Sequence, residues 1–489
     1  MSAHQQRKPS ASSKQLWKAH KYQLRCIARG ISQKFLAYFL DPGLGKTTII
    51  LMLYKILKRC GLVKGLLVIA PLRPCYMVWP KEVKKWSNFS WIKICVLHNE
   101  WKIKKEIAIK QDYDIYVINP EGLKWLLTQL KGKRKWPFDM LVIDESTKFK
   151  NTSTDRFKLL RKIIPKFKRR YILTGTPMPN NIMNLLGQMY IVDMGKSLGT
   201  TKSGFQNKYL IQYGKPEWRQ WKPASEKHEH EIYKRIAPHC IRMKGSDYLD
   251  LPKRIYNIIP VKLPKKAMRH YNEIEQQLFT EIENYGINAE TASSVRIKCL
   301  QIASGRVYED QDPLMKQLPS EKRKIIHVHN AKIEALQDLI EELDGKPLLT
   351  GYRFYHDMLA LKKNFKDLKV MGKGTSMKQC MALEEQWNKG KISHMASYPG
   401  TSALGLNLQQ VGNNVCYFSL VDDLEAFDQY IKRIERQGNK HSRVFVHLLL
   451  AVDTLDYILY KQLQNKDFKQ STFLKYIKVY AKNKGIPTY

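Results

Sequence analysis

Short apolar runs of five to eight residues, separated by longer stretches with helical spacing, occur in two sets along this chain. The first set is LLVIAP (66–71), IYVINP (115–120), MLVIDE (140–145) and YILTGTP (171–177). The second set is PLLTGY (347–352), LKVMG (368–372), VCYFSL (415–420) and RVFVHLLL (443–450). Strand-like runs that alternate with helical patterns are typical of parallel sheets with crossover helices. The sequence therefore predicts an α/β protein with two such domains.

The stretch between the two sets is charged and helical in pattern, without convincing strands, which favours a helical insertion or linker. The predicted organisation is a basic N-terminal tail (1–13), a first α/β domain (14–225), the helical insertion (226–325), a second α/β domain (326–465) and a basic C-terminal helix and tail (466–489). The last segment mixes aromatic and basic residues that could stack on bases. The helical spacing of its apolar positions favours instead a helix packed on the second domain.

The chain carries a large excess of positive charge: 84 Lys and Arg against 44 Asp and Glu give a formal net charge of +40 over 489 residues. The excess is spread along the chain, so a nucleic-acid partner is favoured over a membrane surface or mere solubility. Eight cysteines form no CxxC or Cys/His cluster, as in reduced cytosolic proteins. The apolar runs are too short to span a bilayer, and no apolar segment follows the N-terminus as a signal sequence. A soluble, cytoplasmic protein is expected.

A glycine-rich loop in AYFLDPGLGKTTII (37–50) lies between an apolar run and a stretch with helical spacing. In that context Gly43 and Gly45 let backbone N–H groups approach phosphates, and Lys46 reaches the β and γ oxygens. The Thr47 hydroxyl would complete the shell of a magnesium ion. The strict pattern GxxxxGK[ST] is not met, because Leu40 stands at its first glycine. The alternative is a glycine turn that opens an ordinary helix.

An acid pair follows another apolar run, in LVIDESTKFKN (141–151). Asp144 is predicted to hold Mg²⁺ through water, and Glu145 to orient and deprotonate the attacking water. Such a pair can also be a simple loop entry. The phosphate loop upstream favours the catalytic interpretation.

These segments resemble the motifs of superfamily 2 helicase-type motors of the Swi/Snf-like group, in a minimal form similar to those of bacteriophages. The resemblance runs from about residue 17 to about residue 465 and implies two tandem RecA-like domains. DPGLGKT resembles DEMGLGKT, and DEST resembles the DEAH-type box. HKYQ resembles the adenine-reading segment, LTGTPMPN the coupling motif, TSALGLNLQ motif V, and QYIKRIERQGN the QxxxRxxRxGQ motif.

The resemblance implies roles for individual residues. ATP contacts are expected from Gln23, Asp41, Gly43, Leu44, Gly45, Lys46, Thr47, Thr48 and Gln429. The residues expected to couple hydrolysis to movement are Thr174, Thr176 and Gly405. DNA-backbone contacts are expected from Pro71, Arg73, Pro120, Gly122 and Ser402.

Two arginines of the last motif, Arg433 and Arg436, are three residues apart, so on a helix both project to one side. Such a basic helix is often only solvated. In a tandem motor the two arginines cross the cleft to the γ-phosphate, where arginine fingers contribute roughly 10³–10⁵ in rate. Hydrolysis then depends on domain closure, and closure can move DNA.

Three positions depart from the family pattern: Thr147 replaces a histidine, Asn439 replaces the final glutamine, and Val421 stands where tryptophan is common. None removes a phosphate, metal or water contact, so an active ATPase is expected, with Lys46, Asp144, Glu145, Arg433 and Arg436 as its catalytic residues.

The predicted function is that of an ATP- and Mg²⁺-dependent motor on duplex or branched DNA, acting by translocation, remodelling or branch migration. One alternative is a strand-separating DNA or RNA helicase. Another is a basic nucleic-acid-binding scaffold with a vestigial nucleotide site. The expected location is cytoplasmic, in the host if the chain is viral.

Overall fold

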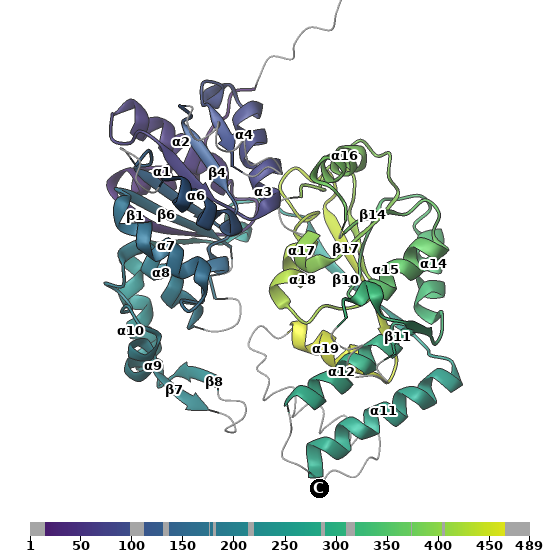
Figure 1. The fold of residues 1–489 in the computed structure, drawn as a ribbon. Helices are drawn as coiled ribbons and strands as arrows, with labels where there is room; N and C mark the ends of the chain where they lie inside the picture. The colour runs from purple at the N-terminus through teal and green to yellow at the C-terminus, as the bar shows by residue number, and fades with distance from the viewer. Residues whose placement is uncertain are drawn as a thin grey trace, which may run out of the picture. The chain divides into compact units, whose positions relative to one another are not determined.

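The computed structural model describes residues 15–97, 112–130, 136–175, 177–178, 182–213, 220–284, 289–309, 318–372, 374–402 and 406–464. The predicted tails, 1–13 and 466–489, lie outside these residues. The described chain divides into two compact units (Figure 1). The first comprises residues up to Met178 with Ile182–Phe205 and Lys227–Lys244, and the second comprises Gln206–Glu226 and the chain from Gly245 onward.

The first unit is built on a parallel sheet, of which the described residues form seven strands in the order β3-β4-β2-β5-β6-β1-β9. The strands are β1 (Phe35–Leu40), β2 (Leu66–Ile69), β3 (Ile94–Val96), β4 (Ile115–Ile118), β5 (Met140–Asp144), β6 (Arg169–Thr174) and β9 (Cys240–Met243). Those in the middle are buried along almost their whole length, and β1, β2 and β5 are almost continuous apolar runs, whereas β6 begins with two arginines. Such runs form strands whose two faces are both covered.

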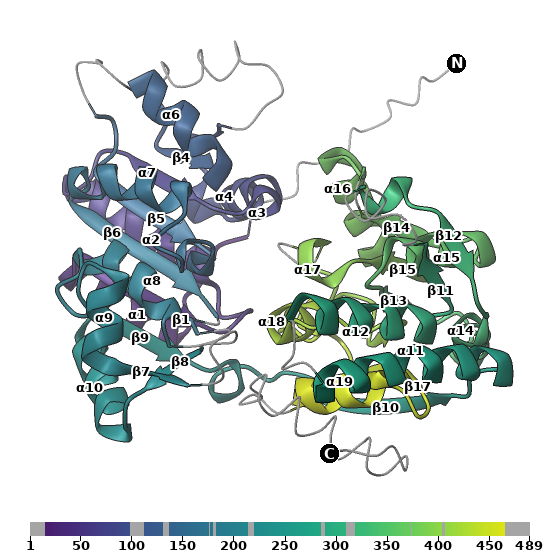
Figure 2. The ribbon, with the colours of Figure 1, turned by 60° about the horizontal axis from the view of Figure 1, so that its bottom comes forward.

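Helices cover both faces of this sheet (Figure 2). They are α1 (Lys21–Ser32), α2 (Lys46–Arg59), α3 (Leu72–Met77), α4 (Trp79–Lys85), α6 (Leu123–Leu130), α7 (Asp155–Ile163), α8 (Asn184–Asp193) and α10 (Glu226–Ile236). The chain passes into the second unit within α9 (Lys202–Tyr209), and an antiparallel hairpin of β7 (Leu210–Tyr213) and β8 (Gln220–Pro223) follows.

The second unit also has a parallel sheet, with six described strands in the order β10-β17-β16-β13-β15-β14. Their bounds are β10 (Lys253–Val261), β13 (Leu348–Gly351), β14 (Lys369–Met371), β15 (His394–Ser397), β16 (Asn414–Tyr417) and β17 (Arg443–Ala451). A small antiparallel pair, β11 (Arg306–Tyr308) and β12 (Ile325–His327), lies outside this sheet.

The helices of the second unit are α11 (Lys265–Asn284), α12 (Ala289–Ala303), α14 (Ala331–Glu342), α15 (Tyr355–Asn364), α16 (Met377–Asn388), α17 (Pro399–Ser402), α18 (Leu424–Ile431) and α19 (Leu455–Gln464). One core cluster joins α14 to the sheet through Leu336, Leu348 and Leu449, all almost fully buried. The two tandem parallel-sheet domains predicted from the sequence are therefore confirmed, and the helical pattern between them corresponds to α11 and α12.

The prediction that residues 226–325 lack strands is wrong. This region contains β9, which completes the first sheet, β10, which pairs along nine residues with β17, and β11. Both β9 and β10 are edge strands, and only Ile241 is buried in β9 and only Val261 in β10. A strand with so few buried positions carries little apolar signal in its sequence. Among the described helices, none is long and apolar enough to cross a membrane.

Candidate active site

The glycine-rich loop joins the carboxyl end of β1 to the first turn of α2, the position at which phosphate loops bind anions. Gly43 and Gly45 have φ angles of 92° and 75°, a left-handed conformation that favours glycine. Lys46 is the first residue of α2, and its Nζ donates a hydrogen bond to the carbonyl of Leu40 at 2.8 Å. The loop thus has the backbone of a phosphate cradle, although Leu40 replaces the first glycine of the strict pattern.

Gln23, the predicted adenine contact, packs directly on this loop. Its Nε2 donates to the Leu44 carbonyl at 3.2 Å, and its Oε1 accepts from the His20 backbone N–H at 2.9 Å. A Cβ at Gly45 would lie 2.5 Å from the Gln23 amide nitrogen. Any side chain at position 45 would therefore clash with Gln23, which is a second reason for glycine there. The adenine contact of Gln23 stays a prediction.

The predicted acid pair stands at the carboxyl end of β5, two strands from β1 in the same sheet. Trp79 Nε1 donates to Asp144 Oδ2 at 3.1 Å. The pKa of Asp144 is raised to about 6, mainly by burial and also by the charge of Glu145, while Lys46 and the Trp79 hydrogen bond oppose the shift. The Lys46 contribution means that the lysine and the acid lie in one electrostatic neighbourhood.

Glu145 has an unusual backbone. Its φ and ψ are 52° and 60°, a left-handed conformation that non-glycine residues rarely adopt. Strain of this kind typically costs about 1–3 kcal/mol and gathers at functional sites. The conformation turns the chain sharply after β5, at the residue predicted to act as the catalytic base.

A buried amide that the sequence did not single out links this acid loop to the coupling motif. Gln188 of α8 accepts a hydrogen bond from Ser146 Oγ at 2.7 Å and donates to the Pro177 carbonyl at 2.6 Å. Ser146 and Gln188 are both fully buried. A glutamine in an apolar helix gives no local signal of such a role, because its partners lie far away in the sequence.

Arg242, on β9, is a second residue of the site that was not predicted from the sequence. Its Nη1 lies 3.1 Å from Asp41 Oδ1 and donates to the carbonyls of Phe39 at 3.1 Å and Gly175 at 2.9 Å. One guanidinium thus contacts the phosphate loop, its strand and the coupling motif. Its strand lies in the region for which the sequence predicted only helices.

The remaining predicted residues of the first unit lie around the same edge of the sheet. Thr174 ends β6, is fully buried and pairs in register with Phe39 of β1. Thr47 lies in the first turn of α2, while Thr48 Oγ1 donates to the Gly45 carbonyl at 2.9 Å. Thr176 lies outside the described residues.

The predicted DNA contacts of this unit follow the carboxyl ends of two neighbouring strands. Pro71 and Arg73 come after β2, and Pro120 and Gly122 come after β4. Parallel neighbours end at the same edge, so both loops lie at the edge that carries the phosphate loop. In the second unit Ser402 ends α17, and Gly405 lies outside the described residues.

The prediction that the two arginines of the last motif lie on a helix is wrong, because α18 ends at Ile431. Turns with hydrogen bonds between residues three apart follow, such as that from the Arg433 N–H to the Tyr430 carbonyl at 3.1 Å. Their guanidiniums nevertheless point to one segment, because Arg433 Nη1 donates to the Leu406 carbonyl at 3.3 Å and Arg436 Nη1 donates to Asn407 Oδ1.

The helix that precedes these arginines is anchored to the edge strand of the second sheet. Arg254 of β10 pairs with Asp428 of α18 at 2.9 Å and with Glu435, which lies between the two arginines. On α18, the amide of Gln429 donates to Glu425 Oε1 at 2.9 Å. Arg433 itself is only 4% exposed.

Comparison with known proteins agrees with this arrangement. The family model described as the SNF2-related domain matches residues 36–306, more than half of the chain. The protein p41 of Acyrthosiphon pisum secondary endosymbiont phage 1 is 33% identical over 448 residues, which cover 89% of this chain and 93% of that protein. The chain therefore belongs to the SNF2-related family, the Swi/Snf-like group of superfamily 2 ATPases, and is an ATP-using enzyme of the helicase type.

More distant relatives match in part. The DNA repair and recombination protein RAD54B of Gallus gallus is 28% identical over 243 residues, 48% of this chain and 25% of that protein. The matching half of this chain thus spans about a quarter of the length of RAD54B. Among solved structures, the Hef helicase domain of Pyrococcus furiosus has the same fold, with a TM-score of 0.52 and 14% identity over 91% of this chain and 98% of that one.

Proposed function

We propose that this chain is an ATP- and Mg²⁺-dependent motor that translocates on or remodels duplex or branched DNA. The observation that carries the proposal is the meeting, at one edge of the first sheet, of a glycine-rich loop, an acid pair whose aspartate is buried, and the predicted coupling motif. The names of the relatives, which include DNA repair and recombination protein RAD54B and DNA annealing helicase and endonuclease ZRANB3, support DNA as the substrate of the motor.

In this proposal the phosphates of ATP take the amino end of α2, where the N–H groups after Gly45 point outward. The Lys46 amine exchanges its bond with the Leu40 carbonyl for the β and γ oxygens. Glu145 then accepts a proton from the attacking water. Arg433 and Arg436 stabilise the charge that develops on the γ-phosphate when the two domains close.

The residues present fit a magnesium ion. Mg²⁺ prefers oxygen ligands and usually takes only one or two carboxylates beside substrate phosphates and water. Asp144 and Thr47 supply such oxygens, and the raised pKa of Asp144 reflects a buried carboxylate that a cation would stabilise. Within the described residues no cluster of three or more His, Cys, Asp and Glu could hold a metal alone. When bound, the ion would neutralise phosphate charge.

DNA is held through its backbone in this proposal. The loops after β2 and β4 and the end of α17 contact phosphates through Pro71, Arg73, Pro120, Gly122 and Ser402. The formal net charge of +40 supplies long-range attraction to the polyanion. Because ATP and DNA meet inside cells, and p41 belongs to a phage, we expect the chain to act in the cytoplasm of a host cell.

The deciding experiment measures ATP turnover with single strand, blunt duplex, fork, four-way junction and RNA in parallel. A DNA motor should be stimulated by duplex or junction, and Lys46→Ala should abolish turnover with every substrate. Displacement of a triplex-forming strand, with a long plain fork left mostly closed, would identify a translocase. Efficient opening of long forks, or stimulation by RNA alone, would support the strand-separating alternative. If the wild type turns over ATP no faster than Lys46→Ala does, the alternative of a nucleic-acid-binding scaffold with a vestigial nucleotide site would be supported.

A further inference from the structure

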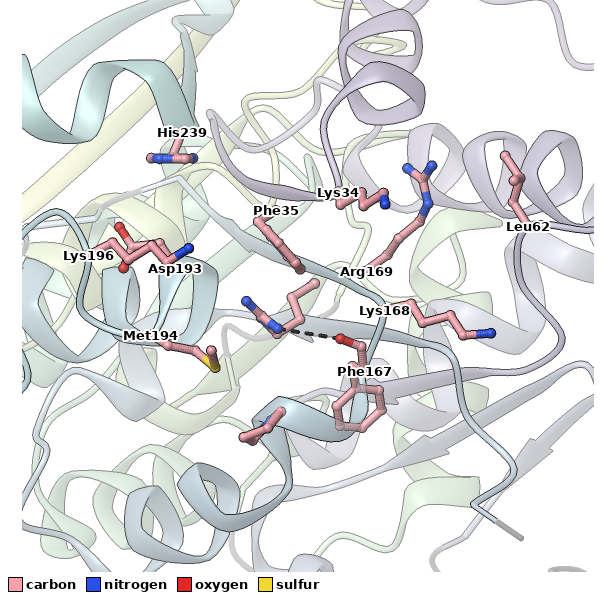
Figure 3. Close-up of a pocket in the computed structure, with 12 residues that line it drawn as sticks. Lys34, Phe35, Leu62, Phe167, Lys168, Arg169, Asp193, Met194, Lys196 and His239 are labelled. Atoms are coloured by element: carbon pink, nitrogen blue, oxygen red, sulfur yellow. Dashed lines mark hydrogen bonds between the residues drawn. The ribbon is translucent and has the colours of Figure 1, made fainter.

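A hollow of about 620 Å³ opens at the amino-terminal edge of the first sheet, opposite to the edge that carries the phosphate loop. Phe35 and Arg169 are the first residues of β1 and β6, and His239 directly precedes β9. Figure 3 shows Lys34, Lys168 and Lys196 around Phe35 and Met194 in this hollow. The hollow is therefore separate from the ATP site, although both belong to one sheet.

Two buried guanidiniums lie behind this hollow without an acidic partner. Arg169 and Arg170 are 6% and 3% exposed. Arg169 Nη1 donates to the Gly30 and Ile31 carbonyls, and Arg170 donates to carbonyls that include Val192 at 2.8 Å. Within the described residues neither has a carboxylate at hydrogen-bond distance.

Asp193, an acid that also lines the hollow, makes no hydrogen bond or ion pair with either guanidinium among the described residues and instead holds the backbone of its own loop. The carboxylate of Asp193 accepts from the backbone N–H groups of Gly195 and Ser197, both at 2.9 Å. The pKa of Arg170 is lowered to about 10, mainly by burial, while the charge of Asp193 acts in the opposite direction. Buried positive charge without a paired acid is unfavourable, so an anion in the hollow would be stabilised electrostatically.

The wall of the hollow is apolar and its rim is basic. Phe35, Met194 and Leu62 line it, and Met194 and Leu62 are 37% and 48% exposed. Lys34 and Lys196 are exposed at the rim. An apolar wall beside lysines suits a ligand that is flat and apolar in one part and anionic in the next. Single-stranded nucleic acid has this chemistry, because its bases are unstacked and its phosphates follow at every step.

We propose that this hollow is a second nucleic-acid site, which takes one base of a single strand against its apolar wall and the adjacent phosphates on its lysine rim. The choice of nucleic acid over an acidic peptide rests on the proposed function. The site itself does not depend on ATP hydrolysis, and it would hold a displaced or flanking strand away from the phosphate-loop edge.

The charge is tested first, with the full chain and a fluorescent oligothymidylate of about ten nucleotides, within the site sizes known for single-strand binding folds. The double variant Lys34→Gln/Lys196→Gln should bind it at least fivefold more weakly, and its slope of log affinity against log salt should be shallower by about 1.4. The control, Lys227→Gln/Lys234→Gln on α10, removes the same charge from exposed positions and should change neither quantity. Melting midpoints of both variants check their folding. Equal losses in the two pairs would overturn the proposal.

The apolar wall is tested with Met194→Gly, since the φ of 58° at this position suits glycine and the backbone is not strained by the change. The variant should bind the ordinary strand about three- to tenfold more weakly than the wild type does. Its affinity for an abasic strand of the same length should equal that of the wild type. Equal losses for both strands would refute base insertion. If polyglutamate binding depends on Lys34 and Lys196 while the oligonucleotide ignores them, the hollow is a peptide site and the proposal fails. Duplex-stimulated ATP turnover of the wild type reports separately on the proposed function.

Discussion

Gln188 and Ser146 form a buried hydrogen bond of 2.7 Å that ties the loop after the acid pair to α8. The same glutamine donates to the Pro177 carbonyl at 2.6 Å, so one amide holds the acid loop and the coupling motif in a fixed relation. If either loop moves, these hydrogen bonds must break or the other loop must move with it. We infer that Gln188 positions Glu145 for the attack of water.

Gln188→Leu should therefore lower both stability and turnover. The substitution leaves the buried Ser146 hydroxyl and the part-buried Pro177 carbonyl without their partner, which should cost about 1–3 kcal/mol in the free energy of unfolding. Ser146→Ala removes one end of the same bond. In urea unfolding the double variant should lose about 1 kcal/mol less than the two single variants added together. Strict additivity would contradict the bridge.

Glu145→Gln should bind ATP and Mg²⁺ as the wild type does, because Lys46, Thr47 and Asp144 remain, but should lose most of its turnover. The amide cannot accept the proton of the attacking water. Fluorescent-nucleotide titration measures binding, and phosphate release measures turnover. Wild-type turnover in this variant would rule out Glu145 as the base.

Asp144→Asn should become more stable relative to the wild type as pH rises. The pKa of Asp144 in the folded protein is about 6, above its ordinary value of 3.8, so the folded wild type binds more protons between these values. Its stability therefore falls as pH rises through this window, by up to about 3 kcal/mol, and the asparagine variant is spared this loss.

Urea unfolding of Asp144→Asn and wild type at pH 4.5, 6 and 7.5, without nucleotide or metal, gives the comparison. The amide can still accept the Trp79 hydrogen bond, so the pH-dependent part of the difference isolates the charge. A difference that is the same at all three pH values would argue against the raised pKa.

Arg433→Lys should spare the binding of ATP and DNA but remove most of the stimulation of ATPase by DNA. Lysine keeps the positive charge but cannot reproduce the planar, forked hydrogen bonding of a guanidinium. This change is preferred to alanine, because Arg433 is 4% exposed and donates to the Gln429 and Leu406 carbonyls. Melting midpoints check the fold. Persistent DNA stimulation would exclude Arg433 from the closed site.

Duplex binding by the wild type should depend steeply on salt and little on sequence. If about five to eight basic residues neutralise phosphates, log affinity should fall against log salt with a slope of about −4 to −7. Anisotropy titrations with two unrelated duplexes between low and physiological salt provide the slope. A flat response, or strong selection between the two duplexes, would contradict a backbone-bound motor.

The central strands and the conformation of the glycine-rich loop could be predicted from the sequence because their determinants are local. Continuous apolar runs such as LLVI at β2 and MLVID at β5 bury every residue, and the glycines that permit the loop stand directly between a strand and a helix. The edge strands carry no such signal. In β10 hydrogen bonds to β17 hold the strand, and these depend on a partner far away in the sequence.

The bridges of the site could not be predicted for a related reason. Gln188 and Arg242 act on partners from other elements, so their importance arises only when the sheet brings β5, β6, β1 and β9 side by side. The hollow at the opposite edge is likewise built from the starts of separate strands. For Arg433 and Arg436 the helical spacing predicted correctly that both side chains point the same way. It did not predict that α18 ends before them, at Ile431.

The left-handed backbone of Glu145 sets two kinds of selection against each other. Glycine at this position would relieve the strain and gain stability, whereas the proposed mechanism needs a carboxylate here to accept a proton. A library of all residues at position 145, sorted by heat tolerance alone, should be enriched in glycine. The same library sorted by turnover should return glutamate. Selection for turnover at position 145 would therefore oppose selection for stability, and the surrounding fold must be stable enough to hold the strained backbone.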